Sequence, residues 1–185
     1  MFSFLVPLLL GFIFNSASTF TTFFTNRLGA KTSRLVCILL RDVLGIPLWA
    51  LGYIMAARAD LAPLFDPGVA GVVAGWLLIL TGGVVIGVGL HSLRGRAAAP
   101  SVDDSLVNWG IYNRIRHPLY SGMLLELAGL FLIIPTFSML VACTLGGIWV
   151  LIQARLEEAD LLQRVPAYRQ YMQRVPRFLP RLRLP

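Results

Sequence analysis

The chain has 185 residues, of which 57% are hydrophobic and only 14% are charged. Soluble domains carry about 25% charged residues, so this composition excludes an ordinary soluble enzyme. The net charge of +7 would suit nucleic acid, but beside several long apolar segments it favours anionic lipid headgroups as the partner. We therefore expect an all-α fold, a polytopic membrane helical bundle with no nucleic-acid partner, and we leave its oligomeric state open.

Five apolar segments approach the ~20 residues that a helix needs to cross a bilayer. They are, approximately, Phe2–Phe24, Leu35–Ala57, Val69–Leu90, Tyr120–Ile134 and Phe137–Gln153. No Lys or Arg precedes the first segment, so we expect a retained span rather than a cleaved signal peptide. The last two segments are short and almost directly joined. We expect them to form a tight helical hairpin, so that the bundle has about five transmembrane helices.

Small and polar residues inside these segments predict how the spans pack. In the third span, Gly71 and Gly75, and then Gly83 and Gly87, have the spacing that lets helix backbones approach closely. The charged pair Arg41-Asp42 falls within the second span. We expect it to be a structural pair that lies against the polar face of the first span, which is formed by Asn15, Ser18 and Thr22.

Cysteine and histidine are too few to suggest a disulfide or a metal centre. Cys37 and Cys143 both fall inside apolar segments, where they are most simply small core residues. The only histidines are His91 and His117, so the sequence offers no cluster of metal ligands and we expect no metal site.

Basic residues predict the orientation of the bundle. Three lie between the first two predicted spans, four between the third and the fourth, and seven in the tail, which places fourteen of the sixteen on one side. Because basic loops stay in the cytoplasm, we expect the amino terminus outside and the carboxyl terminus and active site in the cytoplasm, in an inner membrane of the bacterial type.

The candidate catalytic and binding residues are concentrated on this predicted cytoplasmic side. Arg116-His117-Pro118-Leu119-Tyr120 leads into the fourth span, and Arg155-Leu156-Glu157-Glu158 follows the fifth. The tail adds Tyr168, Tyr171 and Leu179-Pro180. In order and spacing, these motifs resemble the superfamily of isoprenylcysteine carboxyl methyltransferases and phospholipid methyltransferases, over roughly Trp76 to Pro180.

The resemblance implies a membrane methyltransferase that uses S-adenosylmethionine. Residues 1–68 would then form two N-terminal transmembrane helices, and residues 69–185 the methyltransferase core with a cytoplasmic cofactor-binding loop and tail. The implied cofactor pocket is lined by Leu106, Val107, Tyr112, His117, Pro118 and Tyr120. Aromatic faces attract the sulfonium cation of such a cofactor, and a carboxylate accepts hydrogen bonds from its amino group and ribose hydroxyls.

The segment after the hairpin supplies the remaining implied site residues. Glu158, or its neighbour Glu157, is expected to contact the cofactor from the far side. Arg155 is expected to orient the reacting group of the substrate, with Gln153 as the alternative at that position. The tail departs from the superfamily pattern, because Val165-Pro166 stands where relatives have Phe-Gly, with one residue fewer.

Glu126 is a carboxyl group one to two turns into the predicted fourth span. Charged groups inside a membrane are costly and usually functional. Our hypothesis is that Glu126 faces the pocket and helps to select the acceptor as a catalytic residue. The equally weighted alternative is a buried carboxyl group bonded to a neighbouring helix.

The leading functional hypothesis is methyl transfer to a lipid or lipidated acceptor that enters from the bilayer, at a carboxylate, a phospholipid amine or a thiol. A carboxylate acceptor would need a nearby cation such as Arg155, and an amine would favour an acidic residue such as Glu126. The alternative is a catalytically silent membrane scaffold or transporter subunit with the same fold. A related reductase is disfavoured, because no G-x-G-x-x-G motif for a nicotinamide cofactor opens a helix after a strand.

Overall fold

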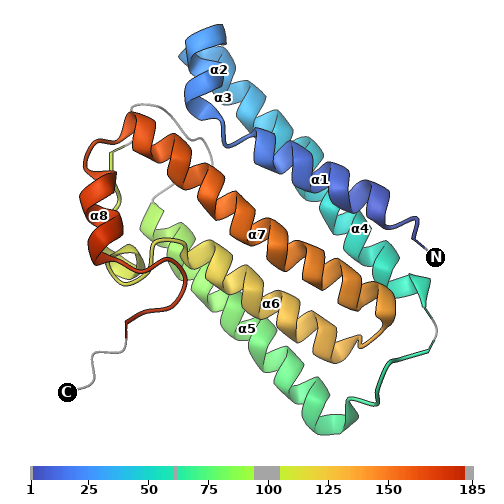
Figure 1. The fold of residues 1–185 in the computed structure, drawn as a ribbon. Coiled ribbons are helices and arrows are strands. Elements are labelled where there is room, and N and C mark those ends of the chain that lie inside the picture. The colour runs from blue at the N-terminus through green and yellow to red at the C-terminus, as the bar shows by residue number, and fades with distance from the viewer. Residues whose placement is uncertain (1, 61, 94–104, 182–185) are drawn as a thin grey trace.

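A computed structural model of the chain describes residues 2–60, 62–93 and 105–181. In chain order these ranges form α1 (Leu5–Ala17), α2 (Thr21–Leu28), α3 (Ala30–Ile38), the π-helical segment η1 (Leu39–Gly45), α4 (Ile46–Ala59), α5 (Gly68–Leu93), the 3-10 turn η3 (Gly110–Asn113), α6 (Pro118–Ile133), α7 (Phe137–Arg164) and α8 (Tyr168–Arg174). The described part contains no strand. Long helices run side by side along the bundle, and α8 lies across one end (Figure 1). The predicted all-α membrane bundle is confirmed.

The predicted spans are all helical but differ in length from the prediction. Three helices are long and apolar enough to cross a bilayer alone: Ala30–Ala59, Gly68–Leu93 and Phe137–Arg164. The pair α1 and α2 qualifies only as one bent span, and α6 is a shorter apolar helix. The last predicted span ends too early at Gln153, because the strong helix formers that follow continue α7 to Arg164.

The first predicted span is interrupted, which corrects the expected continuous helix. The axis bends by 64° between α1 and α2. At the bend, the Ser18 hydroxyl donates to the Asn15 carbonyl at 2.6 Å and the Thr19 hydroxyl to the Ser16 carbonyl. Such side-chain bonds to nearby carbonyls compete with the helical ladder. The polar second half of this segment is therefore the cause of the break.

The second span is helical throughout but is wider in its middle. In η1, the Ile46 N–H donates to the Arg41 carbonyl, five residues earlier, in the manner of a π-helix. Pro47 then lacks the N–H that would continue the bonding pattern at the start of α4. The π-helical segment carries the Arg41-Asp42 pair, whose side chains meet at 2.7 Å. The predicted match of this pair to the polar face of the first span stays a prediction.

Glycines allow α5 and α6 to pack closely, and of the four predicted glycines Gly75 is one of them. A Cβ added at Gly82 would lie 2.6 Å from the Gly122 carbonyl oxygen, and one at Gly75 would lie 2.8 Å from that of Gly129. Gly87 faces open space. The close contacts recur every seven residues along α5, at Gly75, Gly82 and Gly89. Of the predicted pairs, Gly71–Gly75 and Gly83–Gly87, the other three glycines contribute little to the interface.

The predicted hairpin of α6 and α7 forms at Pro135 and Thr136. The Thr136 hydroxyl accepts from the Met139 N–H at 3.3 Å and caps the start of α7. α7 also packs against the N-terminal helices, where the ring of Trp149 stacks on Phe12 with centroids 4.6 Å apart. α7 therefore joins α5 and α6 to the N-terminal helices (Figure 1).

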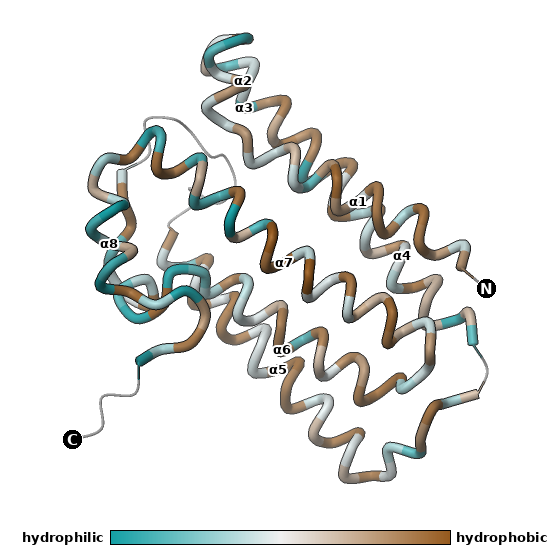
Figure 2. Tube along the Cα trace, in the orientation of Figure 1, coloured by the Kyte–Doolittle hydropathy of each residue, from teal (hydrophilic) through white to brown (hydrophobic). Residues whose placement is uncertain are grey.

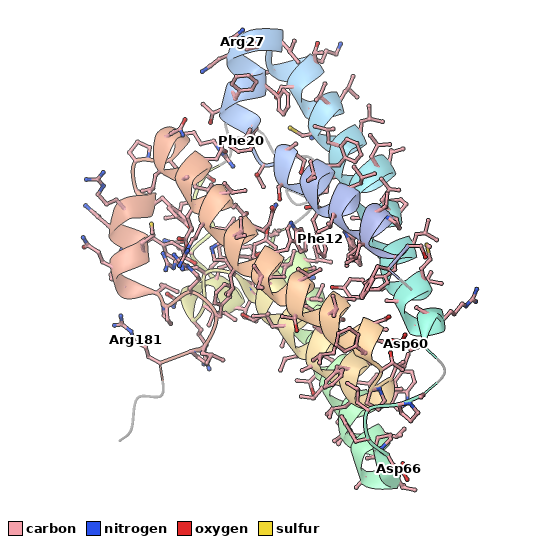
Figure 3. All side chains as sticks on the ribbon, turned by 45° about the vertical axis from the view of Figure 1, so that its right-hand side comes forward. Phe12, Phe20, Arg27, Asp60, Asp66 and Arg181 are labelled. Carbon is pink, nitrogen blue, oxygen red and sulfur yellow. The ribbon has the colours of Figure 1, made fainter. Side chains whose placement is uncertain are left out.

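Polarity divides the bundle along its length. Apolar residues dominate the long helices, and hydrophilic residues gather on α8 and the end of α7 (Figure 2). Arg27 and Arg181 lie toward one end, and Asp60 and Asp66 toward the other (Figure 3). Three residues of the predicted basic side, Arg94, Arg96 and Arg183, lie outside the described residues. The orientation relative to the cytoplasm stays a prediction.

Candidate active site

A cavity of about 350 Å³ lies at the basic end of the bundle, with one wall from the loop before α6, from α7 and from α8, and the other from the N-terminal helices. This volume is in the range of small-molecule sites. The motif wall includes Leu106, Val107, Tyr112, Arg116, His117, Tyr120, Gln153, Glu157, Asp160, Arg164, Tyr168 and Tyr171. The N-terminal wall includes Asn15, Ser18, Thr19, Thr21, Cys37, Arg41, Ile46 and Trp49.

The loop before α6 bends at Gly110 and is held by a hydrogen bond from α8. Gly110 has φ +61°, in the left-handed region, and a Cβ there would meet the Ser92 hydroxyl at 2.8 Å. The η3 turn that follows carries Tyr112, whose carbonyl accepts from the Tyr171 hydroxyl of α8. The tyrosines of the loop and of α8 are thereby held together on one wall.

The segment Arg116-His117 is bonded to the tail by backbone hydrogen bonds. Arg116 N–H donates to the Pro176 carbonyl at 2.9 Å, and His117 N–H donates to the Arg177 carbonyl at 3.0 Å. Pro118 disfavours helix at the preceding residue, and His117 indeed has φ −124° and ψ 64°. The non-helical backbone leaves these N–H groups available for the tail, which closes one side of the site.

Glu158 is buried at the centre of a network with His117, Arg116 and Arg177. It accepts from His117 Nε2 at 3.0 Å and from Arg177 Nη2 at 2.6 Å, and its Oε1 lies 3.2 Å from Arg116 Nη1. Its side chain is only 5% exposed. Glu158 is not among the residues that line the cavity and lies behind His117 and Arg116, whereas the sequence prediction named Glu158 or its neighbour Glu157 as the cofactor contact.

Glu157 is the member of the pair that lines the cavity. Its side chain is 39% exposed, and its Oε2 lies 3.6 Å from His117 Nδ1. The Tyr120 ring stacks on the His117 ring, with centroids 5.3 Å apart. The wall therefore presents a carboxylate, an imidazole and an aromatic face next to one another.

The buried phenols on this wall are neutral. Burial raises the pKa of Tyr112 and Tyr168 above the ordinary phenol value, and it raises the pKa of Tyr171 to about 12. At physiological pH these groups act as hydrogen-bonding and aromatic surfaces and carry no negative charge.

Of the predicted cofactor residues, Leu106, Val107, Tyr112, His117, Tyr120 and Glu157 are brought together on the cavity wall. Pro118 is fully buried and packs toward Gly89 of α5, away from the lining. Arg155 is exposed and outside the lining, whereas the alternative, Gln153, is buried and part of the wall. The predicted placement of Pro118 and Arg155 in the pocket is not what the structure shows.

Glu126 faces α5 and does not line the cavity. A Cβ added at Gly82 would lie 2.7 Å from Glu126 Cγ, and one at Gly83 would lie 3.8 Å from its Oε1. The hypothesis that Glu126 faces the pocket is therefore corrected in favour of a carboxyl group packed against the neighbouring helix.

Sequence reasoning missed the N-terminal wall and part of the motif wall. Asp160 was not predicted, yet it accepts from the Thr22 N–H at 3.0 Å and from Arg164 Nε at 2.8 Å, which links α7 to α2. The available signal was the helical spacing of Gln153, Glu157 and Asp160, because residues three and four apart share one helix face.

Fold and site together define a helical membrane protein with a ligand-sized cavity at the basic end of the bundle. Residues 70–169 match the family model of phospholipid methyltransferases, which covers more than half of the chain. The chain therefore belongs to this family of membrane methyltransferases. No curated protein and no solved structure matches it.

Proposed function

We propose that the protein transfers a methyl group from S-adenosylmethionine to a lipid acceptor, most specifically to the amine headgroup of a phospholipid. The observation that carries this proposal is a cavity with two different walls, one built from the family motifs and one from the first two spans. The family match supports the methyl-transfer chemistry, and the N-terminal wall lies outside the matched residues.

The motif wall suits the cofactor chemically. A bound cofactor would supply a methyl group on a sulfonium sulfur; the acceptor's lone pair would bond to the methyl carbon, and the neutral thioether S-adenosylhomocysteine would be the leaving group. Tyr112 and Tyr120 offer aromatic faces to the sulfonium cation. Glu158 holds the His117 ring in place from behind.

The mixed charges on the cavity wall favour a headgroup that carries both signs. An amine headgroup arrives protonated and must lose a proton before its nitrogen can attack. Glu157 and Asp160 are carboxylates on the wall, but Asp160 is already bonded by Arg164 and by the Thr22 N–H. We therefore assign Glu157 as the group that accepts this proton, next to His117.

The acceptor reaches Glu157 and His117 along the N-terminal helices. Positioning the acceptor in line with the bond from sulfur to methyl supplies most of the rate in such a transfer. Trp49 and Ile46 give this wall an apolar surface, and Arg41 gives it a cation suited to a phosphate. Asp42 holds the Arg41 guanidinium through contacts of 2.7 and 3.0 Å.

The activity is tested with purified protein, methyl-labelled S-adenosylmethionine and lipid extracts in vesicles. The proposal predicts label in a phospholipid whose headgroup carries an amine. Label in a carboxyl ester or a thioether would overturn the acceptor assignment, and the absence of any transfer would favour the silent scaffold.

Replacing the Arg41-Asp42 pair by Gln and Asn is expected to weaken use of the acceptor without affecting the cofactor. The double replacement keeps the net charge and removes the cation from the N-terminal wall. We expect kcat/KM for the phospholipid to fall about tenfold or more, mainly through KM. The affinity for S-adenosylhomocysteine should be unchanged.

Arg58→Gln is the matched control, because Arg58 is exposed on α4 and outside the cavity lining. Steady-state kinetics in vesicles measure KM for the phospholipid, and calorimetry measures the affinity for S-adenosylhomocysteine. An unchanged KM in the double variant, or an equal change in the control, would rule out the acceptor role of Arg41.

A further inference from the structure

Gln153 is a buried amide on the cavity wall whose orientation is set by the first span. It is 1% exposed and belongs to the cavity lining. Its Oε1 accepts from the Ser16 hydroxyl of α1 at 2.8 Å, and the Ser16 oxygen accepts from Trp149 Nε1 at 3.1 Å. The family match begins at residue 70, so Ser16 lies outside it. A residue of the first span therefore holds a side chain of the motif wall.

The direction of these hydrogen bonds follows from what each group can donate. An indole N–H only donates, so the Ser16 oxygen accepts from Trp149 and its own hydrogen is directed to Gln153 Oε1. The amide oxygen is thereby occupied, and the amide nitrogen with its two hydrogens is the end that Gln153 offers to the cavity. One N–H faces the hydroxyl of Tyr120, which lines the same cavity. The second N–H is available to an acceptor oxygen of a ligand.

The spacing along α7 relates this donor to Glu157. Gln153 and Glu157 are four residues apart and both line the cavity, so they share one face of the helix, about one turn or ~5.4 Å apart. Along this face, a carboxylate is followed by an amide donor. A phospholipid amine has the complementary order, because a short carbon arm separates its cationic nitrogen from phosphate oxygens, which only accept hydrogen bonds.

We infer that the Gln153 amide donates to a phosphate oxygen of the acceptor headgroup while Glu157 receives its amine, and that Ser16 positions the amide for this contact. The inference rests on the proposed function and deepens it by naming the headgroup class, an aminoalkyl phosphodiester. Arg41 on the opposite wall presents a cation to the same phosphate. The headgroup is then bound at both of its charges, which aligns its nitrogen for the transfer.

The test compares an acceptor that has a phosphate with one that lacks it: phosphatidylethanolamine and a long-chain primary alkylamine, each in phosphatidylcholine vesicles. Steady-state kinetics with the full-length protein and methyl-labelled S-adenosylmethionine give kcat/KM for both acceptors. We expect the wild type to prefer the phospholipid, and Ser16→Ala to lower this preference about tenfold by raising KM for the phospholipid alone. Ser16→Thr keeps a hydroxyl and should restore the preference. Gln153→Leu removes the amide itself and should lose the preference as Ser16→Ala does.

Ser138→Ala is the matched control, because Ser138 is a fully buried serine of α7 outside the cavity lining. It should keep the wild-type preference. Calorimetry should give the wild-type affinity for S-adenosylhomocysteine in every variant, and a loss of that affinity in Gln153→Leu would place the amide against the cofactor and overturn the inference.

The kinetics overturn the inference if Ser16→Ala or Gln153→Leu keeps the preference, if either slows both acceptors equally, if Ser16→Thr behaves as Ser16→Ala does, or if the wild type has no preference. Transfer to neither acceptor by the wild type would instead overturn the proposed function on which the inference rests.

Discussion

Glu158→Gln is expected to lower the free energy of unfolding by about 3–5 kcal/mol and to abolish measurable binding of S-adenosylhomocysteine. The replacement keeps the shape of the side chain and removes its charge. Arg116, Arg177 and His117 would then share a buried space without the carboxylate that pairs with them. Unfolding by denaturant in detergent measures the free energy of unfolding, and calorimetry measures the binding of S-adenosylhomocysteine.

Glu157→Gln is the control for this prediction, because it changes the adjacent carboxylate on the same helix. Its side chain is 39% exposed, so its loss should leave the stability near that of the wild type while methyl transfer falls. If Glu158→Gln unfolded at the wild-type denaturant concentration, the buried network would not be the element that holds the site together.

Gly82→Ala is expected to destabilise the protein by about 1–3 kcal/mol and to weaken ligand binding. The added Cβ would lie 2.6 Å from the Gly122 carbonyl oxygen, which is backbone and cannot turn aside. α5 and α6 must then separate. Because these two helices flank the loop that carries Leu106, Val107 and Tyr112, their separation disturbs the motif wall.

Gly87→Ala provides a control with the same chemical change in the same helix. A Cβ at Gly87 meets nothing within 4 Å, so only the general preference of helices for alanine remains, which stabilises by about 0.5–1 kcal/mol. The two variants should therefore shift thermal unfolding in opposite directions. A shift of the same sign and size in both would contradict the close packing of α5 on α6.

The sequence was sufficient to predict the local features of the site. Pro118 predicted the non-helical turn at His117, and the apolar segments predicted the helices on both sides of it. It did not establish the rotation of α7, which decides whether Gln153 or Arg155, and Glu157 or Glu158, faces the cavity. That rotation depends on long-range packing, such as Trp149 against Phe12 of α1.

The second wall of the cavity was beyond sequence reasoning for a related reason. The break after Ala17 and the π-helical turn at Arg41 arise from polar side chains and from Pro47, each of which also fits an unbroken apolar span. Which face of these helices meets α7 is set by contacts between residues far apart in the chain, such as the Ser16 hydroxyl donating to Gln153 at 2.8 Å.

Binding of S-adenosylhomocysteine to a cavity-filling variant tests the central claim most directly. Leu106→Trp places a large side chain in the wall of the cavity, and Leu179→Trp makes the same change at a tail residue that is 78% exposed. Calorimetry is expected to show binding to the wild type and to Leu179→Trp, and none to Leu106→Trp when that variant unfolds at the wild-type temperature. Undiminished binding to a folded Leu106→Trp, or no binding to the wild type, would contradict the assignment of this cavity to the cofactor.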